Sequence, residues 1–178
     1  MFFFNRKPKT TIMKLAKSLA PVFAEYTIAT FDDENNFWLH ENSGLEGKPE
    51  LFQEWLLYRL FCDFNGYKAS MKSHDAYIEF SQIFLKTCGD MFMAKAIFSS
   101  IAEYEQLGKS RFSDYVDALN DRDGTEAIQN VGRRFLVNTR CSPDNYSQLL
   151  GASAIFSIYS IAAKETLDKL QSEYRLVE

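Results

Sequence analysis

Apolar residues recur every three or four positions along most of this chain, a spacing that places them on one face of an α-helix. In residues 10–20, for example, Ile12, Leu15 and Leu19 share a face, while Lys14 and Lys17 point away from it. Later segments repeat the pattern with aromatic residues. The periodicity therefore predicts an all-α fold: one domain over residues 1–178, a bundle of six or seven helices, with residues 1–9 as a flexible tail.

Capping residues and helix breakers indicate where these helices begin and end. Ser73 and Ser110 are suited to cap helix N-termini, and Pro143 suits the first turn of the last helix. Pro21 is expected to end or kink the first helix, and Gly108 to end a helix before the one that Ser110 caps. The last helix is predicted to run from Pro143 to about residue 174.

The segment between residues 26 and 41 allows two interpretations. Its β-branched and aromatic residues flank a polar turn, Asp32–Asn36, which is the pattern of a small β-hairpin. The alternative is a helix to Phe31 followed by a long loop, held in place by Trp38 against the core.

The last helix has an unusual distribution of polarity. No charged residue occurs between Asn145 and Ala163, and the polar side chains form one narrow stripe on a helical wheel: Ser153, Ser157, Ser160 and Lys164. The uncharged stretch is too short and too serine-rich to cross a membrane. A helix that is apolar on most sides is surrounded by other helices. It is therefore predicted to be either the long core helix of the bundle or a helix shared between two subunits.

Small residues on this helix would allow a second helix to approach closely. The predicted interface comprises Gly151, Ala154, Ile155, Ile158 and Ala162.

Charge and cysteine content narrow the function classes. The net charge of −4 disfavours general nucleic-acid binding, but residues 1–20 carry only basic charges and residues 25–54 are strongly acidic, so the two segments can attract each other within or between chains. Three scattered cysteines favour free thiols in a cytoplasmic protein. The N-terminal residues Phe2, Phe3 and Phe4 precede a basic cluster, an order opposite to that of a secretory signal; they suggest at most peripheral membrane contact.

Motifs for catalysis and metal binding are incomplete. The Asn120–Glu126 turn resembles the centre of an EF-hand loop, but Leu119 and Asn130 occupy the first and last ligand positions. His40 and His74 are the only histidines and lack metal-ligand spacing, and no phosphate loop or nucleophile motif occurs. The sequence therefore predicts no catalytic residue, no metal and no cofactor.

One alternative is DNA binding through residues 110–138, where two predicted helices flank a glycine-containing turn. Gln129, Asn130, Arg133 and Arg134 are residue types that contact bases and phosphates. Against this alternative, the flanking residues are acidic.

The favoured hypothesis is a non-catalytic, cytoplasmic helical protein that works by binding a protein partner, either a second copy of itself or a regulatory or adaptor partner. A second alternative is a pocket for a small apolar ligand, lined by aromatic residues: Phe80, Phe84, Phe92, Phe98, Phe156 and Tyr159.

Overall fold

The structure is a computed structural model that describes residues 7–71 and 73–177 of the chain, and it confirms the all-α prediction. Within those residues, seven α-helices, one 3₁₀-helix and two short strands follow one another. Their order is β1 (Lys9–Thr11), α1 (Ile12–Ala29), η1 (Glu34–Asn36), α2 (Phe37–Asn42), α3 (Pro49–Ser70), α4 (His74–Ala94), α5 (Ile101–Asn120), α6 (Gly124–Asn138), α7 (Tyr146–Glu173) and β2 (Arg175–Val177).

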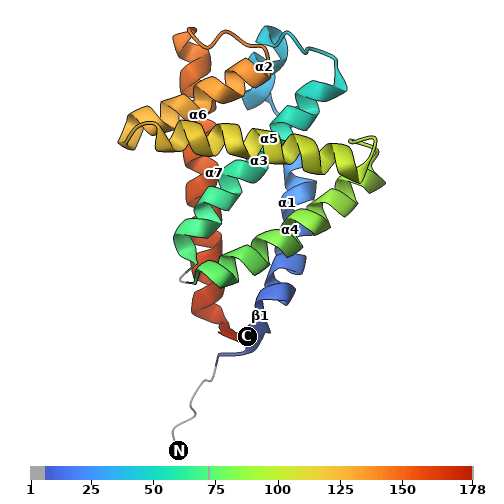
Figure 1. Ribbon diagram of the computed structural model, residues 1–178, viewed down its shortest axis with the longest axis vertical. Coiled ribbons are helices and arrows are strands. Elements are labelled where there is room, and N and C mark those ends of the chain that lie inside the picture. The colour runs from blue at the N-terminus through green and yellow to red at the C-terminus, as the bar shows by residue number, and fades with distance from the viewer. Residues whose placement is uncertain (1–6, 72, 178) are drawn as a thin grey trace, which may run out of the picture.

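Helix α3 forms the centre of the bundle. Most of its residues are buried on every side, including Trp55, Leu56 and Tyr58. In Figure 1, α5 crosses in front of α3 and α4 crosses in front of α1, while α7 runs behind α3 along the long axis of the molecule. The predicted core helix at the C-terminus is therefore a long outer helix of the monomer, and α3 occupies the central position instead.

Helix α1 continues through Pro21 to Ala29 rather than ending at the proline. Thr11 begins the helix, because its side chain accepts a hydrogen bond from the backbone N–H of Lys14. The buried face of α1 packs mainly against α4.

The predicted β-hairpin at residues 26–41 is wrong. After α1, a turn leads into η1 and the short helix α2. The Asp33 side chain accepts a hydrogen bond from the Asn35 backbone N–H, and Asn36 donates one from Nδ2 to the carbonyl of Thr30 at 2.7 Å. These local bonds satisfy backbone groups that a hairpin ladder would otherwise pair, and the helical turn also buries Leu39 in the core.

Two predicted helix boundaries also shift. Gly108 lies inside α5, which begins at Ile101 after the capping residue Ser100, so Ser110 caps no helix. The last helix starts at Tyr146 rather than Pro143, because the side chain of Asn145 accepts the hydrogen bond from Gln148. In both cases a different polar residue supplies the capping oxygen: Ser100, ten positions before Ser110, and Asn145, two positions after Pro143.

A two-stranded parallel sheet joins the beginning of the chain to its end. Lys9 pairs with Arg175, and the Pro8 carbonyl accepts a hydrogen bond from Arg175 N–H at 2.9 Å. The sequence did not predict these strands. Of the expected flexible tail, residues 1–6 lie outside the described residues, whereas Pro8 and Lys9 are held by this pairing.

Candidate functional site

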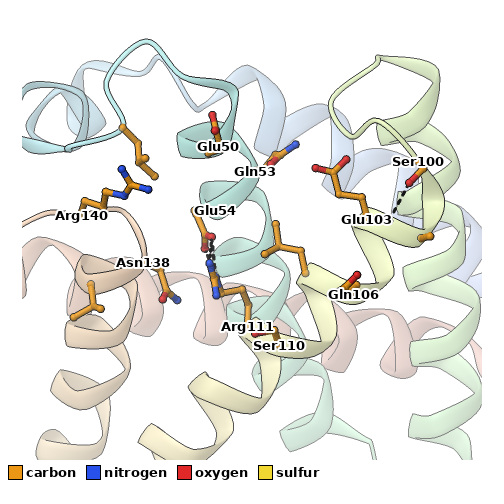
Figure 2. Close-up of a pocket in the computed structure, with 14 residues that line it drawn as sticks. Glu50, Gln53, Glu54, Ser100, Glu103, Gln106, Ser110, Arg111, Asn138 and Arg140 are labelled. Atoms are coloured by element: carbon orange, nitrogen blue, oxygen red, sulfur yellow. Dashed lines mark hydrogen bonds and ion pairs between the residues drawn. The ribbon is translucent and has the colours of Figure 1, made fainter.

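A cavity of about 790 Å³ opens between the N-terminal half of α3, the N-terminal half of α5 and the C-terminal end of α6 (Figure 2). Ten of its fourteen lining residues are polar or charged. The lining consists of Leu45, Glu50, Gln53, Glu54, Ser100, Ala102, Glu103, Gln106, Leu107, Ser110, Arg111, Val137, Asn138 and Arg140. The cavity thus differs in character from the apolar pocket suggested as a sequence-based alternative.

An ion pair between α3 and α5 lies at the centre of this cavity. Arg111 donates from Nε to Glu54 Oε2 at 2.7 Å and from Nη2 to Glu54 Oε1 at 2.5 Å. Burial raises the pKa of the Glu54 carboxyl, and the hydrogen bonds from Arg111 partly oppose this rise. The two-point contact fixes α5 against the central helix and leaves the pair electrically neutral.

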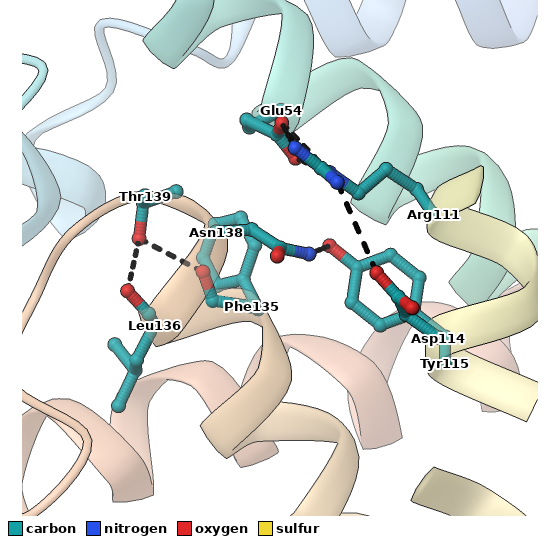
Figure 3. A network of polar contacts seen from close by, with 8 residues as sticks. All are labelled: Glu54, Arg111, Asp114, Tyr115, Phe135, Leu136, Asn138 and Thr139. Atoms are coloured by element: carbon teal, nitrogen blue, oxygen red, sulfur yellow. Dashed lines mark hydrogen bonds and ion pairs between the residues drawn. The ribbon is translucent and has the colours of Figure 1, made fainter. Parts of the chain in front are cut away.

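A second set of polar contacts extends from this pair to the end of α6 (Figure 3). Arg111 Nη1 lies 3.8 Å from Asp114, and Asn138 donates from Nδ2 to the hydroxyl of Tyr115 at 3.3 Å. The hydroxyl of Thr139 donates back into α6, to the Phe135 carbonyl at 2.9 Å. The network positions the last turn of α6 beside the cavity.

Arg140 follows that turn with a backbone φ of 58°, a left-handed conformation in which glycine is the usual residue. Its side chain lies against Gly44, where an added Cβ would come within 2.9 Å of Arg140 Cβ. The Gly44 N–H also donates to the Arg140 carbonyl at 3.3 Å. The missing side chain at Gly44 and the unusual backbone at Arg140 together place a guanidinium at one side of the cavity (Figure 2).

The serine stripe of α7 faces the interior of the protein. Ser153 and Ser160 are buried, and Ser160 donates a hydrogen bond from its hydroxyl to the Cys62 carbonyl on α3 at 2.9 Å. An added Cβ at Gly66 of α3 would overlap the Ser160 carbonyl oxygen. Small side chains are therefore needed where α3 and α7 approach each other, and that requirement turns the larger residues of α7 outward.

The outward face of α7 is apolar. Ile158 is 61% exposed and Ile161 57%, and Ala154 and Ala162 are also exposed. Of the other residues in the predicted interface, Ile155 is half-buried, whereas Gly151 packs against the indole of Trp38, 3.2 Å from the position of an added Cβ. Trp38 thus docks onto α7, while four of the five predicted interface residues lie at or near the surface.

A buried arginine connects α7 with α1. Arg59 of α3 is only 1% exposed, and its Nε and Nη1 have no hydrogen-bond partner among the described residues. Its Cζ lies 3.0 Å from the ring centroid of Tyr159 on α7 and 5.7 Å from that of Tyr26 on α1. Asp63, one turn further along α3, has a pKa raised to about 7 by burial, with Arg59 opposing the shift. Cation–π contacts thus hold the guanidinium between the two outer helices.

The residues of the DNA-binding alternative lie together on α6. Arg133 and Arg134 are exposed, but Arg133 donates from Nη1 to Asn130 at 2.9 Å, and Asn130 donates to Asp121 at 3.4 Å. Gln129 is half-buried beside them. The basic side chains are thus partly engaged within the chain, and DNA binding stays a prediction.

Aromatic residues proposed for an apolar ligand pocket fill the core instead. The ring centroids of Phe80 and Phe84 are 5.4 Å apart, and those of Phe92 and Phe98 6.2 Å apart. Phe156 stacks on Phe61, and Tyr159 covers Arg59. None of these residues lines the polar cavity between α3, α5 and α6.

Other features bear on the predicted function classes. Within residues 7–71 and 73–177, no group of three or more potential metal ligands occurs, and no helix there has both the length and the apolarity to cross a membrane. Phe2, Phe3 and Phe4, suggested as a peripheral membrane contact, lie outside the described residues. The three cysteines are free and buried.

Comparison of the chain with protein-family models, curated proteins and solved structures gives no match.

Sequence reasoning missed the polar cavity altogether. Glu54 and Arg111 are separated by 57 positions. In the sequence each resembles an ordinary surface charge, so neither residue indicates that the two form an ion pair. Arg140 gave no signal either, because its backbone conformation is visible only in the folded chain.

Proposed function

We propose that this chain acts without catalysis by binding a protein partner through α1 and α7, and that the partner is a second copy of the chain. The observation that carries the proposal is the reversed polarity of α7, whose serines face inward and whose isoleucines face outward. A helix that packs on only one side ordinarily buries its large aliphatic residues and exposes its serines. Exposed aliphatic residues gathered on one helix are typical of an interaction surface.

The spacing of residues on this face supports pairing with a second copy. About Ile158 the outward residues read the same in both directions: Ile155 and Ile161 lie three positions away, and Ala154 and Ala162 four. In an antiparallel pair related by a two-fold axis at Ile158, each residue meets the one at the mirrored position. Ile155 would face Ile161 of the second copy, and Ala154 would face Ala162. A two-fold interface requires such self-complementarity.

Charge along α1 supports the same arrangement. Lys14 and Lys17 are exposed near the start of α1, whereas the exposed acids Asp32, Asp33 and Glu34 follow its end. An axis that reverses α7 also reverses α1, because the two helices run along the same long direction of the molecule (Figure 1). The basic end of each copy would then lie toward the acidic end of the other. Attraction of this kind favours the antiparallel pairing over a parallel one.

Light scattering over a range of protein concentrations tests the proposal. We expect a mass of twice 20.6 kDa at high concentration, and weaker association at higher salt because the end charges are screened. Ile158→Glu should raise the dissociation constant by at least about tenfold, because each dimer would bury two carboxylates beside apolar groups. Val116→Glu is the matched control, since Val116 is a half-exposed aliphatic residue of α5, a helix that crosses in front of α3 while α7 runs behind it.

Cross-linking tests the position of the two-fold axis. Ile158→Cys should form a disulfide with its own counterpart under mild oxidation, because a residue on the axis meets its copy. Ile161→Cys should cross-link much less, since its counterpart lies about 9 Å further along the helix. The native thiols are buried and should not compete. A chain that stays monomeric at all concentrations, or that cross-links equally at both positions, contradicts self-pairing through this face.

A cytoplasmic location is part of this proposal. It is supported by the three unpaired, buried thiols, because a reducing compartment keeps cysteines in that state.

A further inference from the structure

The polar cavity between α3, α5 and α6 has a different character from the apolar α1–α7 face, and it carries an inference that does not depend on dimer formation. We propose that this cavity binds a short peptide by its two charged ends, with the peptide carboxylate at Arg140 and its ammonium group at Glu103. Figure 2 shows these two side chains at opposite sides of the cavity, with the Glu54–Arg111 pair between them.

Arg140 supplies a cation that no other described residue pairs with. Its guanidinium takes part in none of the ion pairs found among the described residues. The left-handed backbone at this position disfavours any residue with a side chain, yet arginine stands there, and Gly44 makes room for it. Backbone strain of this kind is concentrated at binding sites. A guanidinium fork matches the two oxygens of a carboxylate.

Glu103 supplies a fixed anion at the other side. Its Oε2 accepts hydrogen bonds from the backbone N–H and the hydroxyl of Ser99, both at 2.6 Å. These bonds lower the pKa of the carboxyl, so it remains ionised. They hold the carboxylate in place through Oε2, and a side-chain hydrogen bond from Gln53, which also lines the cavity, lowers the same pKa further.

The middle of the cavity suits an uncharged backbone. Glu54 and Arg111 neutralise each other, so no net charge is offered there. Gln106 and Ser110 line the same wall of α5 and carry both donors and acceptors. A peptide backbone presents N–H and C=O groups that these side chains can pair with.

The balance of charge favours a zwitterion over a phosphate. Three carboxylates line the cavity, those of Glu50, Glu54 and Glu103, against the two guanidinium groups of Arg111 and Arg140. A doubly charged phosphate would be repelled by this surplus of acid. A peptide with one carboxylate and one ammonium group is neutral overall and can place each charge beside its opposite.

Calorimetric titration of the full chain with glycine, diglycine, triglycine and tetraglycine tests the proposal. We expect affinity to increase with length until the peptide reaches from Arg140 to Glu103. Acetylating the amino end or amidating the carboxyl end of the best peptide should each weaken binding at least tenfold. Inorganic phosphate should not compete. Absence of binding for all four peptides, or equal binding of the blocked peptides, would overturn the proposal.

Two variants separate binding from folding. Arg140→Gly should abolish binding and at the same time raise the melting temperature, because glycine suits the left-handed backbone. Glu103→Gln should weaken binding at least tenfold while keeping the cap, since a glutamine oxygen can still accept from Ser99. Arg122→Ala is the control, because Arg122 is exposed and lies outside the cavity. If Arg140→Gly binds the peptide as the unaltered chain does, the assignment is wrong.

Discussion

Helices α3 and α7 pack against each other and each carries five charged residues, yet only α3 buries any of them. Helix α3 places Glu54, Arg59 and Asp63 in the interior, whereas α7 exposes Ile158 and Ile161. Position in the bundle explains the difference. Helix α3 is enclosed by other helices, so even its polar residues are buried, while α7 has only one inner face, and that face needs small side chains. Average hydrophobicity therefore does not decide which helix is central.

The ion pair on α3 gives the sharpest test of this comparison. Arg111→Met should lower the free energy of unfolding by about 3 kcal/mol, because it leaves the buried Glu54 carboxylate without its partner. Urea denaturation measures the change. Adding Glu54→Leu should restore most of the loss, since no buried charge would remain. Equal stability of the single and double variants would show that Glu54 is well solvated in the folded state.

The close approach of the two helices predicts the next largest effect. Gly66→Ala should destabilise the protein by about 2–3 kcal/mol, because the added Cβ overlaps the Ser160 carbonyl, and backbone cannot move aside cheaply. Gly108→Ala is the matched control within α5. There the added Cβ would lie 3.6 Å from Leu57, an ordinary contact, so a gain of about 0.5–1 kcal/mol is expected from the helix preference of alanine. Similar thermal shifts for both variants would contradict the tight crossing.

The same comparison explains what the sequence could predict. Helical periodicity and the Ser73 cap correctly located helices, because both depend on residues within one or two turns of each other. The central role of α3 was missed, because Glu54 and Asp63 interrupt its apolar pattern. Their burial depends on contacts with distant helices, such as Arg111 of α5.

The two candidate sites differ in the same way in how far the sequence could predict them. The residues of the α7 face could be named from the sequence, since a single helix carries them. That this face of α7 points outward could not be predicted, because its direction depends on the close contact between Gly66 and Ser160. The polar cavity needs three elements at once, and its cation at Arg140 depends on Gly44, almost a hundred positions earlier. No local pattern reports such an arrangement.

Asp63 is expected to make the stability of the fold depend on pH. No residue of α7 can have this effect, because α7 buries no carboxylate. The pKa of Asp63 rises from 3.8 to about 7 on folding. The folded chain therefore binds more protons between these values, and stability from this group decreases as the pH rises through that interval. The groups that interact with Asp63 lie on three helices: Arg59, Cys62 and Tyr67 on α3, Cys88 on α4 and Tyr159 on α7.

Asp63→Asn isolates this contribution. It should raise the free energy of unfolding at pH 8 on the order of 2 kcal/mol, because it removes a buried negative charge, and change little at pH 4, where Asp63 is already neutral. Urea denaturation at the two pH values measures the difference. A variant that is less stable at pH 8 would mean that Asp63 serves Arg59 as an essential counter-ion.

The smallest effect is expected from two serines on the inner face of α7. Both are equally buried, but Ser160 donates a hydrogen bond to Cys62 of α3, whereas the Ser153 hydroxyl has no partner among the described residues. Ser160→Ala should therefore cost about 1 kcal/mol, the usual net value of a buried hydrogen bond. Ser153→Ala should be neutral or slightly stabilising, because it removes a buried polar group that gains nothing from folding. Thermal unfolding of the two variants side by side distinguishes these outcomes. If Ser153→Ala is as damaging as Ser160→Ala, the Ser153 hydroxyl is paired in solution, and the inner face of α7 is held by more polar contacts than the bond to Cys62.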